Sequence, residues 1–250
     1  MLRFRYLIIL IACGFAACEK TTNDLEINSV HVYYPLEVGQ VFYYNLDSLV
    51  FVNFGQQKVI RSYDAKDEVL QRSISNNDTT YYINRQIKPR GTGTWANNIS
   101  YTVLKTPQQV QVTEENLRFI KLTNPVRDFF QWTGNSYLPY RPLRSLFEFS
   151  NDEDIQYWNY EYSSVNESAV VAGTNYATTI TVMQAGDSVN VPILVPNGIA
   201  YKNHWEEKFA LGIGLIERKI EIWEYQPQIG GQHSYSSGFG IHLQLVSVER

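Results

Sequence analysis

The histidine and acidic residues of the chain do not have the spacing of a known metal site. A zinc helix needs two histidines four positions apart with a glutamate between them, and His204–Glu207 provides only the first histidine. The acidic run Asp152–Asp154 offers oxygen ligands for calcium, but it has neither the alternating spacing nor the glycine of a calcium loop. We interpret this run as a solvated acidic turn. The four histidines, which we interpret as ordinary strand or surface residues, are His31, His204, His233 and His242. We therefore expect no metal and no cofactor.

Motifs for nucleophilic or acid–base catalysis are also absent from the sequence. The Gly-x-Ser-x-Gly motif of serine hydrolases occurs nowhere. Paired carboxylates for glycoside hydrolysis are brought together only by the fold, so sequence cannot exclude them. Glu161, Glu206 and Glu217 lie on expected strands, but nothing distinguishes them from charged residues on a solvent face. We expect no catalytic residues, and an envelope hydrolase is the least supported function.

Tryptophan is the residue type that best suits a binding role. Aromatic rings offer a broad apolar surface with a polar edge, which suits stacking on sugars. Trp95 and Trp132 lie in glycine-containing loops, where binding groups are common, whereas Trp158 and Trp223 lie in alternating segments that favour the core. Trp95 and Trp132 are therefore the candidate ligand-binding residues, and the alternative is that they fill the core or anchor loops.

The first 17 residues have the order of a secretory signal peptide. Arg3 and Arg5 precede an apolar stretch over 6–17, which ends in small residues before Cys18. This stretch is too short for a spanning helix, which needs about 20 apolar residues. The chain turns polar after Cys18, so we expect a tether over 18–30 and a folded body over 31–250.

A cysteine directly after such a signal resembles the lipobox of bacterial lipoproteins, in which the cysteine carries acyl chains. Two cysteines compete for this role. Cys13 has the more usual residues before it, but cleavage there leaves a hydrophobic core of only residues 6–12 and a free thiol at Cys18. Cleavage before Cys18 acylates the last remaining cysteine. We therefore expect lipidation at Cys18, with Cys13 as the alternative.

Composition excludes one class of partner and one means of stabilisation. Removing residues 1–17 leaves 19 of the 21 basic residues against 25 acidic ones, a formal charge of about −6. Nucleic acid is therefore a poor partner, because its phosphates need a clustered basic surface. A single remaining cysteine allows no internal disulfide, so stability must come from a core of aromatic and β-branched residues.

Almost every periodic segment alternates with a period of two, which predicts strands. Two hairpins are expected, 68–74 with 79–88 around Asn76–Asp78, and 109–113 with 117–122 around Glu114–Asn116. Further strands are expected over 41–51, 155–165, 177–184, 204–210, 215–225 and 239–248. In the last of these, Phe239, Ile241, Leu243 and Leu245 share one face.

Helical patterns are weak by comparison. Short helices are conceivable over 141–149 and 203–208. The acidic run at 150–154, after a proline-rich loop, could divide the body into two halves. The expected fold is mainly β, with curved antiparallel sheets in a half-barrel or sandwich-like arrangement and at most one or two short helices.

Two blocks resemble uncharacterised cell-envelope lipoproteins of Bacteroidota. The block over 34–44 is similar to their PLxVGxxWxY start, with Phe42 in place of Trp, and the block over 209–219 is similar to their YAxGIGLIxxE segment, with Phe209 in place of Tyr. The resemblance implies an outer-membrane or periplasm-facing lipoprotein with a curved antiparallel sheet, and it implies no functional residues. Gly212-x-Gly214 lacks the third glycine and the following helix of a dinucleotide site, so we expect a tight reversal between two strands.

These patterns favour a non-catalytic lipoprotein of the outer membrane, anchored through its acylated cysteine. It would act as a scaffold or binding module for a protein or a small amphiphile. The alternative is a glycan-binding lipoprotein that uses exposed aromatic residues.

Overall fold

The computed structural model describes residues 29–250 except 145, 148 and 150, and it leaves the side chains of 97 and 98 undescribed. The predicted signal peptide over 1–17, Cys13, Cys18 and most of the tether lie outside the described residues. Twelve strands and two short 3-10 helices make up the described part. The helices are η2 (Val30–Tyr33) and η3 (Ile155–Tyr157). The strands are β1 (Val41–Val52), β2 (Gln57–Ser75), β3 (Asp78–Pro89), β4 (Ala96–Lys105), β5 (Gln109–Glu114), β6 (Leu117–Thr123), β7 (Gln131–Thr133), β8 (Asn159–Val171), β9 (Thr174–Val189), β10 (Ala200–Ala210), β11 (Gly214–Gln226) and β12 (Tyr235–Glu249).

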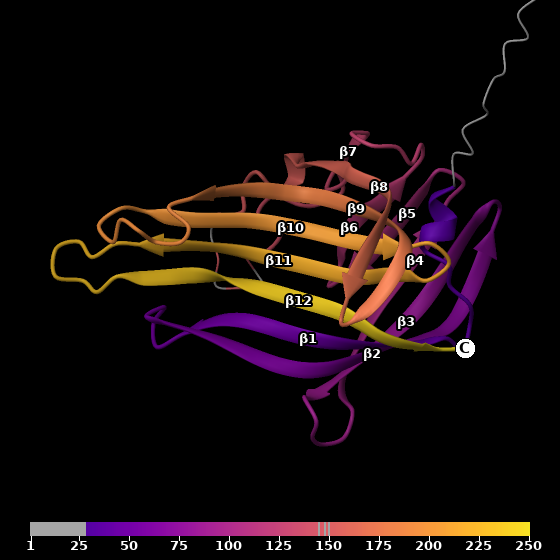
Figure 1. Cartoon of the computed structure of the whole chain (residues 1–250), viewed down its shortest axis with the longest axis horizontal. Coiled ribbons are helices and arrows are strands. Elements are labelled where there is room, and N and C mark those ends of the chain that lie inside the picture. Colours follow the sequence, from indigo (N-terminus) through magenta and orange to yellow (C-terminus); the bar gives the residue numbers. More distant parts are fainter. Residues whose placement is uncertain (1–28, 145, 148, 150) are drawn as a thin grey trace, which may run out of the picture.

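All twelve described strands belong to one antiparallel sheet, in the order β6-β5-β4-β3-β2-β1-β12-β11-β10-β9-β8-β7. Strands that follow one another in sequence pair with each other, except β6 and β7, which form the two edges, and β1 also pairs with β12, with Val41 opposite Glu249. This pairing places the first and last strands side by side in the middle of the sheet (Figure 1). The division predicted near 150–154 falls in the connection between β7 and β8, and it stays a prediction.

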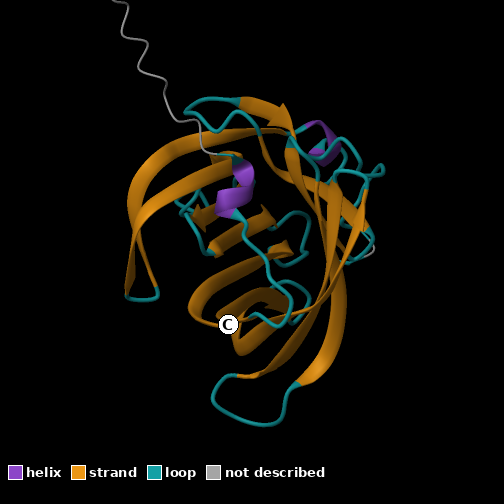
Figure 2. Ribbon diagram, turned by 90° about the vertical axis from the view of Figure 1, so that its right-hand side faces the viewer, coloured by secondary structure: helices purple, strands orange, loops and turns teal. Residues whose placement is uncertain are grey.

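The two edges of the sheet approach each other and nearly close it into a barrel-like shape (Figure 2). The backbone N–H of Ile120 on β6 donates to the carbonyl of Gly134, directly after β7, at 2.8 Å. The indole N–H of Trp132 on β7 also donates to the carbonyl of Ile120, at 2.8 Å. These two bonds satisfy edge groups that an open sheet would leave exposed.

The interior holds two apolar clusters. The first cluster is rich in tyrosine and includes Tyr34, Tyr44, Tyr160, Tyr162 and Phe209. The second cluster includes Phe119, Trp205, Ile220, Ile222 and Phe239. The structure thus buries aromatic and branched aliphatic side chains on the inner face of a twisted sheet, as expected for a core without disulfides.

The two resemblance blocks, far apart in sequence, pack together at one end of the sheet. The backbone N–H of Gly212 donates to the carbonyl of Val32 in η2 at 2.8 Å. The rings of Tyr34 and Phe209 lie 5.7 Å apart. Gly212 and Gly214 have φ values of 72° and 114°, which a side chain would strain, and they form the expected reversal between β10 and β11.

The sequence-based fold class is confirmed, and both expected hairpins form. Asn76, Glu115 and Asn116 adopt positive φ in the turns between β2 and β3 and between β5 and β6. The strands β4 and β7 were not expected. Among the described residues there is no helix long and apolar enough to cross a bilayer.

Both helix predictions are wrong. Residues 203–208 lie within β10. Their buried side chains, Trp205 and Glu207, continue with Phe209 at every second position, which is the period of a strand and not of a helix. The described residues of 141–149 form turns and bends. The interpretation of Asp152 as solvated is also wrong, because its side chain is fully buried and accepts the backbone N–H groups of Leu143 and Arg144 at 2.8 and 3.0 Å.

We expect Gly134→Ala to destabilise the protein by about 1–3 kcal/mol, because an added Cβ would overlap the ring of the buried Tyr160 at the seam between β6 and β7. Urea denaturation measures the effect. Gly186→Ala is the control, since its Cβ would meet only Met183, at 3.6 Å. Equal stability of the two variants would contradict the importance of this close packing.

Candidate functional site

The candidate site is an apolar cavity of about 300 Å³ on the inner side of the sheet. Its walls come from strands on both halves of the sheet and from the loop that carries Leu143 and Phe147. Phe147 stacks on Phe239 with ring centroids 3.6 Å apart. The apolar lining consists of Leu46, Ile87, Ile99, Leu117, Phe119, Leu143, Leu146, Phe147, Trp205, Ile220, Phe239, Ile241 and Leu243.

Charged side chains line one part of the cavity. Arg85, Glu114 and Arg218 all contribute to its wall. Arg218 donates to Glu114 at 2.9 Å, and Arg85 lies 3.7 Å from the same carboxylate. The indole N–H of Trp205, a residue only 5% exposed, has no hydrogen-bond partner among the described residues. A cavity with an apolar wall and a few convergent polar groups is the usual form of a small-molecule site.

These cavity residues belong to a larger ion-pair network that crosses the interior. Arg85 makes a bidentate pair with Asp67, at 2.7 and 2.6 Å, and the hydroxyl of Tyr101 also donates to Asp67, at 2.8 Å. On the other side, Arg218 donates to Glu207 at 2.5 Å. We call Asp67, Arg85, Glu114, Arg218, Glu207 and Lys121 the ionic belt.

Lys121 completes the belt and, with Glu207, occupies its least solvated part. Its side chain is 1% exposed and lies 2.9 Å from Glu207, which is fully buried. Gln184 donates to the second oxygen of Glu207 at 2.8 Å. The ammonium also lies 4.6 and 5.1 Å from the ring centroids of Phe119 and Trp205, which provides cation–π attraction.

The belt lies between the two apolar clusters. On β10, Phe209 belongs to the first cluster and Trp205 to the second, and Glu207 is the inward-facing residue between them. On β11, Arg218 stands in the same way between Ile216 and Ile220. Because successive inward positions are two residues apart, one charged residue per strand builds a charged layer across the interior.

The pKa shifts show that opposite charges outweigh burial at Glu114 and Glu207 but not at Lys121. Burial raises the pKa of Glu114, but the nearby charges of Arg218 and Arg85 lower it by more, so that the pKa is about 2. Burial likewise opposes ionisation of Glu207, and Lys121 and Arg218 bring its pKa below the ordinary value. Burial lowers the pKa of Lys121 despite the neighbouring Glu207. With three cations and three anions, the belt has no net formal charge.

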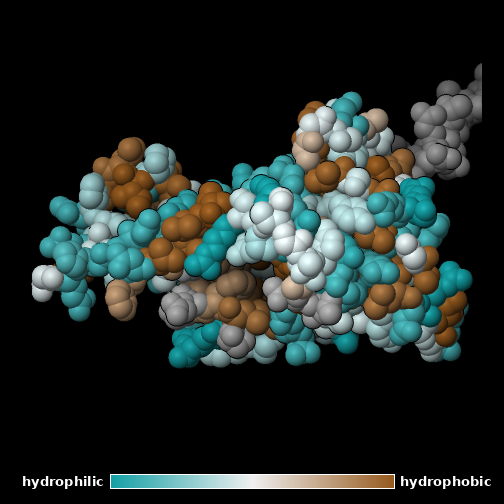
Figure 3. All heavy atoms as spheres, turned by 90° about the horizontal axis from the view of Figure 1, so that it is seen from below, coloured by the Kyte–Doolittle hydropathy of each residue, from teal (hydrophilic) through white to brown (hydrophobic). Residues whose placement is uncertain are grey.

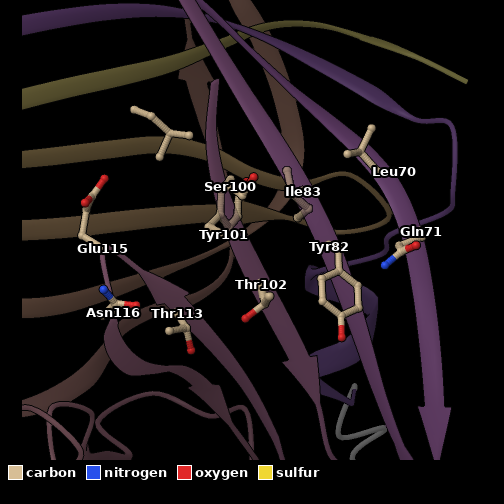
Figure 4. A pocket seen from close by; sticks show the side chains of 11 residues that line it. Leu70, Gln71, Tyr82, Ile83, Ser100, Tyr101, Thr102, Thr113, Glu115 and Asn116 are labelled. Carbon is tan, nitrogen blue, oxygen red and sulfur yellow. The ribbon is translucent and has the colours of Figure 1, made fainter. Parts of the chain in front are cut away.

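A second, more polar hollow of about 710 Å³ lies beside the cavity (Figure 4). Tyr82, 38% exposed, is surrounded there by hydroxyl and amide side chains. The hollow is lined by Leu70, Gln71, Tyr82, Ile83, Ile99, Ser100, Tyr101, Thr102, Thr113, Glu115 and Asn116. We call it the polar groove.

The polar groove and the cavity share part of their walls. Ile99, Tyr101 and Glu115 line both. The shared wall lies where β4 extends beyond its partner, since the pairing of β4 with β5 covers only 102–105 of β4. One layer of residues therefore separates a hydroxyl-rich surface from an apolar interior.

The structure does not bring the candidate aromatic residues together. Trp132 lies on β7 rather than in a loop, and its half-buried ring packs against Tyr162 at 4.7 Å. Trp95 precedes β4, and its ring lies between Lys66 and Lys88, at 5.3 and 4.8 Å from the two ammonium nitrogens. Neither tryptophan lines the cavity or the polar groove. Sugar stacking by these two residues stays a prediction.

The acids considered from sequence are not those of the site. Glu206 and Glu217 pair with Lys208 at 2.8 Å on the opposite face from Glu207 and Arg218. Glu161 accepts from Gln131, outside the cavity. The described residues contain no group of three or more histidine, aspartate, glutamate or cysteine residues placed to hold a metal.

Comparisons with known proteins find two solved structures but no family. No family model and no curated protein matches the chain. Two solved structures are similar to it. One is a candidate exported protein with a YmcC-like fold from Bacteroides fragilis, with 10% identity and a TM-score of 0.41. The other is a candidate lipoprotein from Parabacteroides distasonis, with 9% identity and a TM-score of 0.43. Each alignment covers 87% of this chain and 98% of the other.

We expect Lys121→Met to destabilise the protein by about 3 kcal/mol or more, because it leaves Glu207 buried with one cation fewer. Thermal and urea unfolding measure the loss. The matched control is Lys202→Met, which removes a half-buried pair with Glu221 and should cost less than about 1 kcal/mol. Equal losses in the two variants would show that burial of the belt has no special cost.

Acid should destabilise the protein through the same carboxylates. The pKa of Glu114 is lowered from 4.5 to about 2 on folding, so its stabilisation is complete above about pH 4.5 and is lost as pH falls toward 2. Urea midpoints measured from pH 6 to pH 2 should decline in this window. The decline should be shallower in Glu114→Gln and unchanged in Glu115→Gln, an exposed neighbour. A Glu114→Gln curve parallel to the parent would refute this assignment.

Proposed function

We propose that the chain is an exported, lipid-anchored binding protein of the outer membrane that takes up an amphiphile without transforming it. The observation that carries the proposal is the cavity, whose wall is apolar except for Arg85, Tyr101, Glu114, Glu115 and Arg218. The predicted signal peptide and acylation at Cys18, with Cys13 as the alternative, support the location.

The size of the cavity limits the ligand. Ligand pockets commonly range over about 300–1,000 Å³, and this cavity of about 300 Å³ lies at the lower end. It suits one short apolar chain rather than a diacyl lipid. Trp205 and Arg218 both line the cavity, and the indole N–H of Trp205 has no hydrogen-bond partner among the described residues, so these two side chains are the candidate donors to an oxygen of the ligand.

The electrostatics favour binding over acid–base catalysis. A general acid in glycoside hydrolysis needs a raised pKa. Arg218 and Arg85 hold the pKa of Glu114 at about 2, and Lys121 and Arg218 lower the pKa of Glu207. Both carboxylates are engaged in ion pairs, which supports a structural role for them.

The second candidate function is glycan binding, and the polar groove is the observation that favours it. Tyr82 presents a partly exposed ring at one end of a row that continues through the hydroxyls of Thr102 and Thr113, an arrangement suited to the faces and hydroxyls of a sugar (Figure 4). Because the groove adjoins the cavity, an amphiphile with a hydroxyl-rich head could use both.

Three probes with related chemistry test these functions: n-octanol, n-octyl glucoside below its micellar concentration, and glucose. Binding to the full chain in lipid nanodiscs is measured by calorimetry. We expect saturable binding of both octyl compounds, weakened by about tenfold or more in Leu46→Trp, since exclusion of two methylenes costs about 0.8 kcal/mol each. Leu46 is chosen because it lines the cavity and is only partly buried.

Val246→Trp is the matched control, because Val246 is 50% exposed and lines neither hollow. Binding that is absent from the parent, or equal in parent and Leu46→Trp, would refute amphiphile uptake. Glucose binding that disappears in Tyr82→Ala would instead support glycan capture at the polar groove.

A further inference from the structure

Three loops at one end of the sheet each expose a large apolar side chain. Phe54 in the β1–β2 turn is 92% exposed, Leu194 in the β9–β10 loop is 80% exposed, and Ile229 in the β11–β12 loop is 69% exposed. The β9–β10 loop, over 190–199, adds further exposed aliphatic residues, namely Val191, Ile193, Val195 and Ile199. We call the loops over 53–56, 190–199 and 227–234 the apolar tip.

The apolar tip carries no formal charge. No aspartate, glutamate, lysine or arginine occurs over 48–57, 188–201 or 225–248. These three runs include all three loops and the strand ends that support them. Soluble surfaces usually intersperse both signs of charge, so an uncharged end with exposed aliphatic residues indicates an interaction surface.

The three loops are neighbours in space as well as similar in composition. The backbone N–H of Ser236, at the start of β12, donates to the carbonyl of Gly55 at 2.8 Å. The hydroxyl of Tyr225, at the end of β11, donates to the carbonyl of Pro196 at 2.9 Å. The loops lie at the left end of the molecule in Figure 1, and Figure 3 shows a group of apolar residues at that end among hydrophilic ones.

The chemistry of the apolar tip fits hydrocarbon better than a protein partner. Protein interfaces are enriched in arginine and aromatic residues that match a complementary surface. Here the exposed residues are mostly valine, isoleucine and leucine on separate projecting loops, with nothing charged to set an orientation. Tyr201, Tyr225 and Tyr235 stand at the bases of the loops, and tyrosine is typical of the level where a bilayer meets water.

We propose that the apolar tip inserts into the interfacial region of a lipid bilayer. It lies at the far end of the strands from η2, which contacts the β10–β11 turn through Val32 and Gly212. The first described residues therefore leave the fold opposite the apolar tip. Two bilayers offer the hydrocarbon boundary that the apolar tip fits. One is the bilayer that holds the proposed N-terminal anchor, and the other is a second, opposing bilayer. This inference rests on the loops alone and does not require an occupied cavity.

Depth-dependent quenching tests the proposal on the full chain held in nanodiscs. A fluorophore is attached at Val195→Cys, a position 58% exposed, and nitroxide lipids are placed either in the nanodisc or in added vesicles. We expect lipid quenching of this fluorophore, together with protection from aqueous iodide. Quenching by nanodisc lipids identifies the anchoring bilayer, and quenching only by added vesicles identifies a second one.

Two comparisons make the result specific. The same label at Asn175→Cys, an exposed position in the β8–β9 hairpin, should remain open to iodide and unquenched by lipid. Adding Leu194→Asp to Val195→Cys should abolish lipid quenching, and both sites are too exposed for the substitutions to disturb the core. The parent chain without an added cysteine reports any label on Cys13 or Cys18.

Three outcomes would overturn the proposal. The first is lipid quenching at Val195→Cys no stronger than at Asn175→Cys. The second is quenching that survives Leu194→Asp. The third is protection from iodide that rises with protein concentration and is not accompanied by lipid quenching, which would assign the apolar tip to contacts between copies of the chain.

Discussion

The ionic belt is the constraint on which the rest of the interior depends. Asp67, Glu114 and Glu207 are matched by three cations on strands of both halves of the sheet. A buried polar network is tolerable only when its members are satisfied, because an unpaired buried charge costs several kcal/mol. The belt therefore fixes how far the sheet can curl, since any other curvature would separate β5 and β6 from β10 and β11.

The belt also specifies strand register. A slip of one residue in β10 that brought Lys208 to the inward position of Glu207 would place a second cation beside Lys121 in place of its carboxylate. An apolar interior alone would resist such a slip through packing, and a belt adds the cost of an uncompensated charge. We infer that the belt contributes more to the uniqueness of the fold than to its net stability, because replacement of buried ion pairs by apolar residues is often neutral or stabilising.

Sequence predicted the strands well because their signal is local. Alternation over 41–51 and 239–248 and the turn residues at Asn76 and Asn116 need no knowledge of the tertiary fold. The strand β7 was missed because three residues give no periodic signal, and β4 because it follows a glycine-rich loop directly. The helix expected over 203–208 failed because strand pairing on both sides of β10 decides its conformation.

The site could not be predicted, because its signal is the pairing of residues distant in sequence. Glu206, Glu207 and Lys208 are consecutive charged residues in the sequence, and only the fold shows that Glu207 faces the interior. Lys121 and Glu207 are 86 positions apart, and Arg218 and Glu114 are 104 apart. A lysine between the apolar residues Ile120 and Leu122 was the available hint, since an unbroken apolar neighbourhood on both sides is unusual for a solvated residue.

The features of the molecule follow one another along the strands, and this order constrains how a ligand is held. On β10, one passes from Phe209 in the tyrosine-rich cluster to Glu207 in the belt, then to Trp205 at the cavity, and then to the apolar tip that precedes Ala200. On β11 the same order runs from Ile216 through Arg218 to Ile220. The belt thus forms the boundary of the cavity on the side of η2, because an apolar chain would have to displace ion pairs to go further. An amphiphile in the cavity would therefore have its apolar chain confined between the belt and the strand ends that carry the apolar tip.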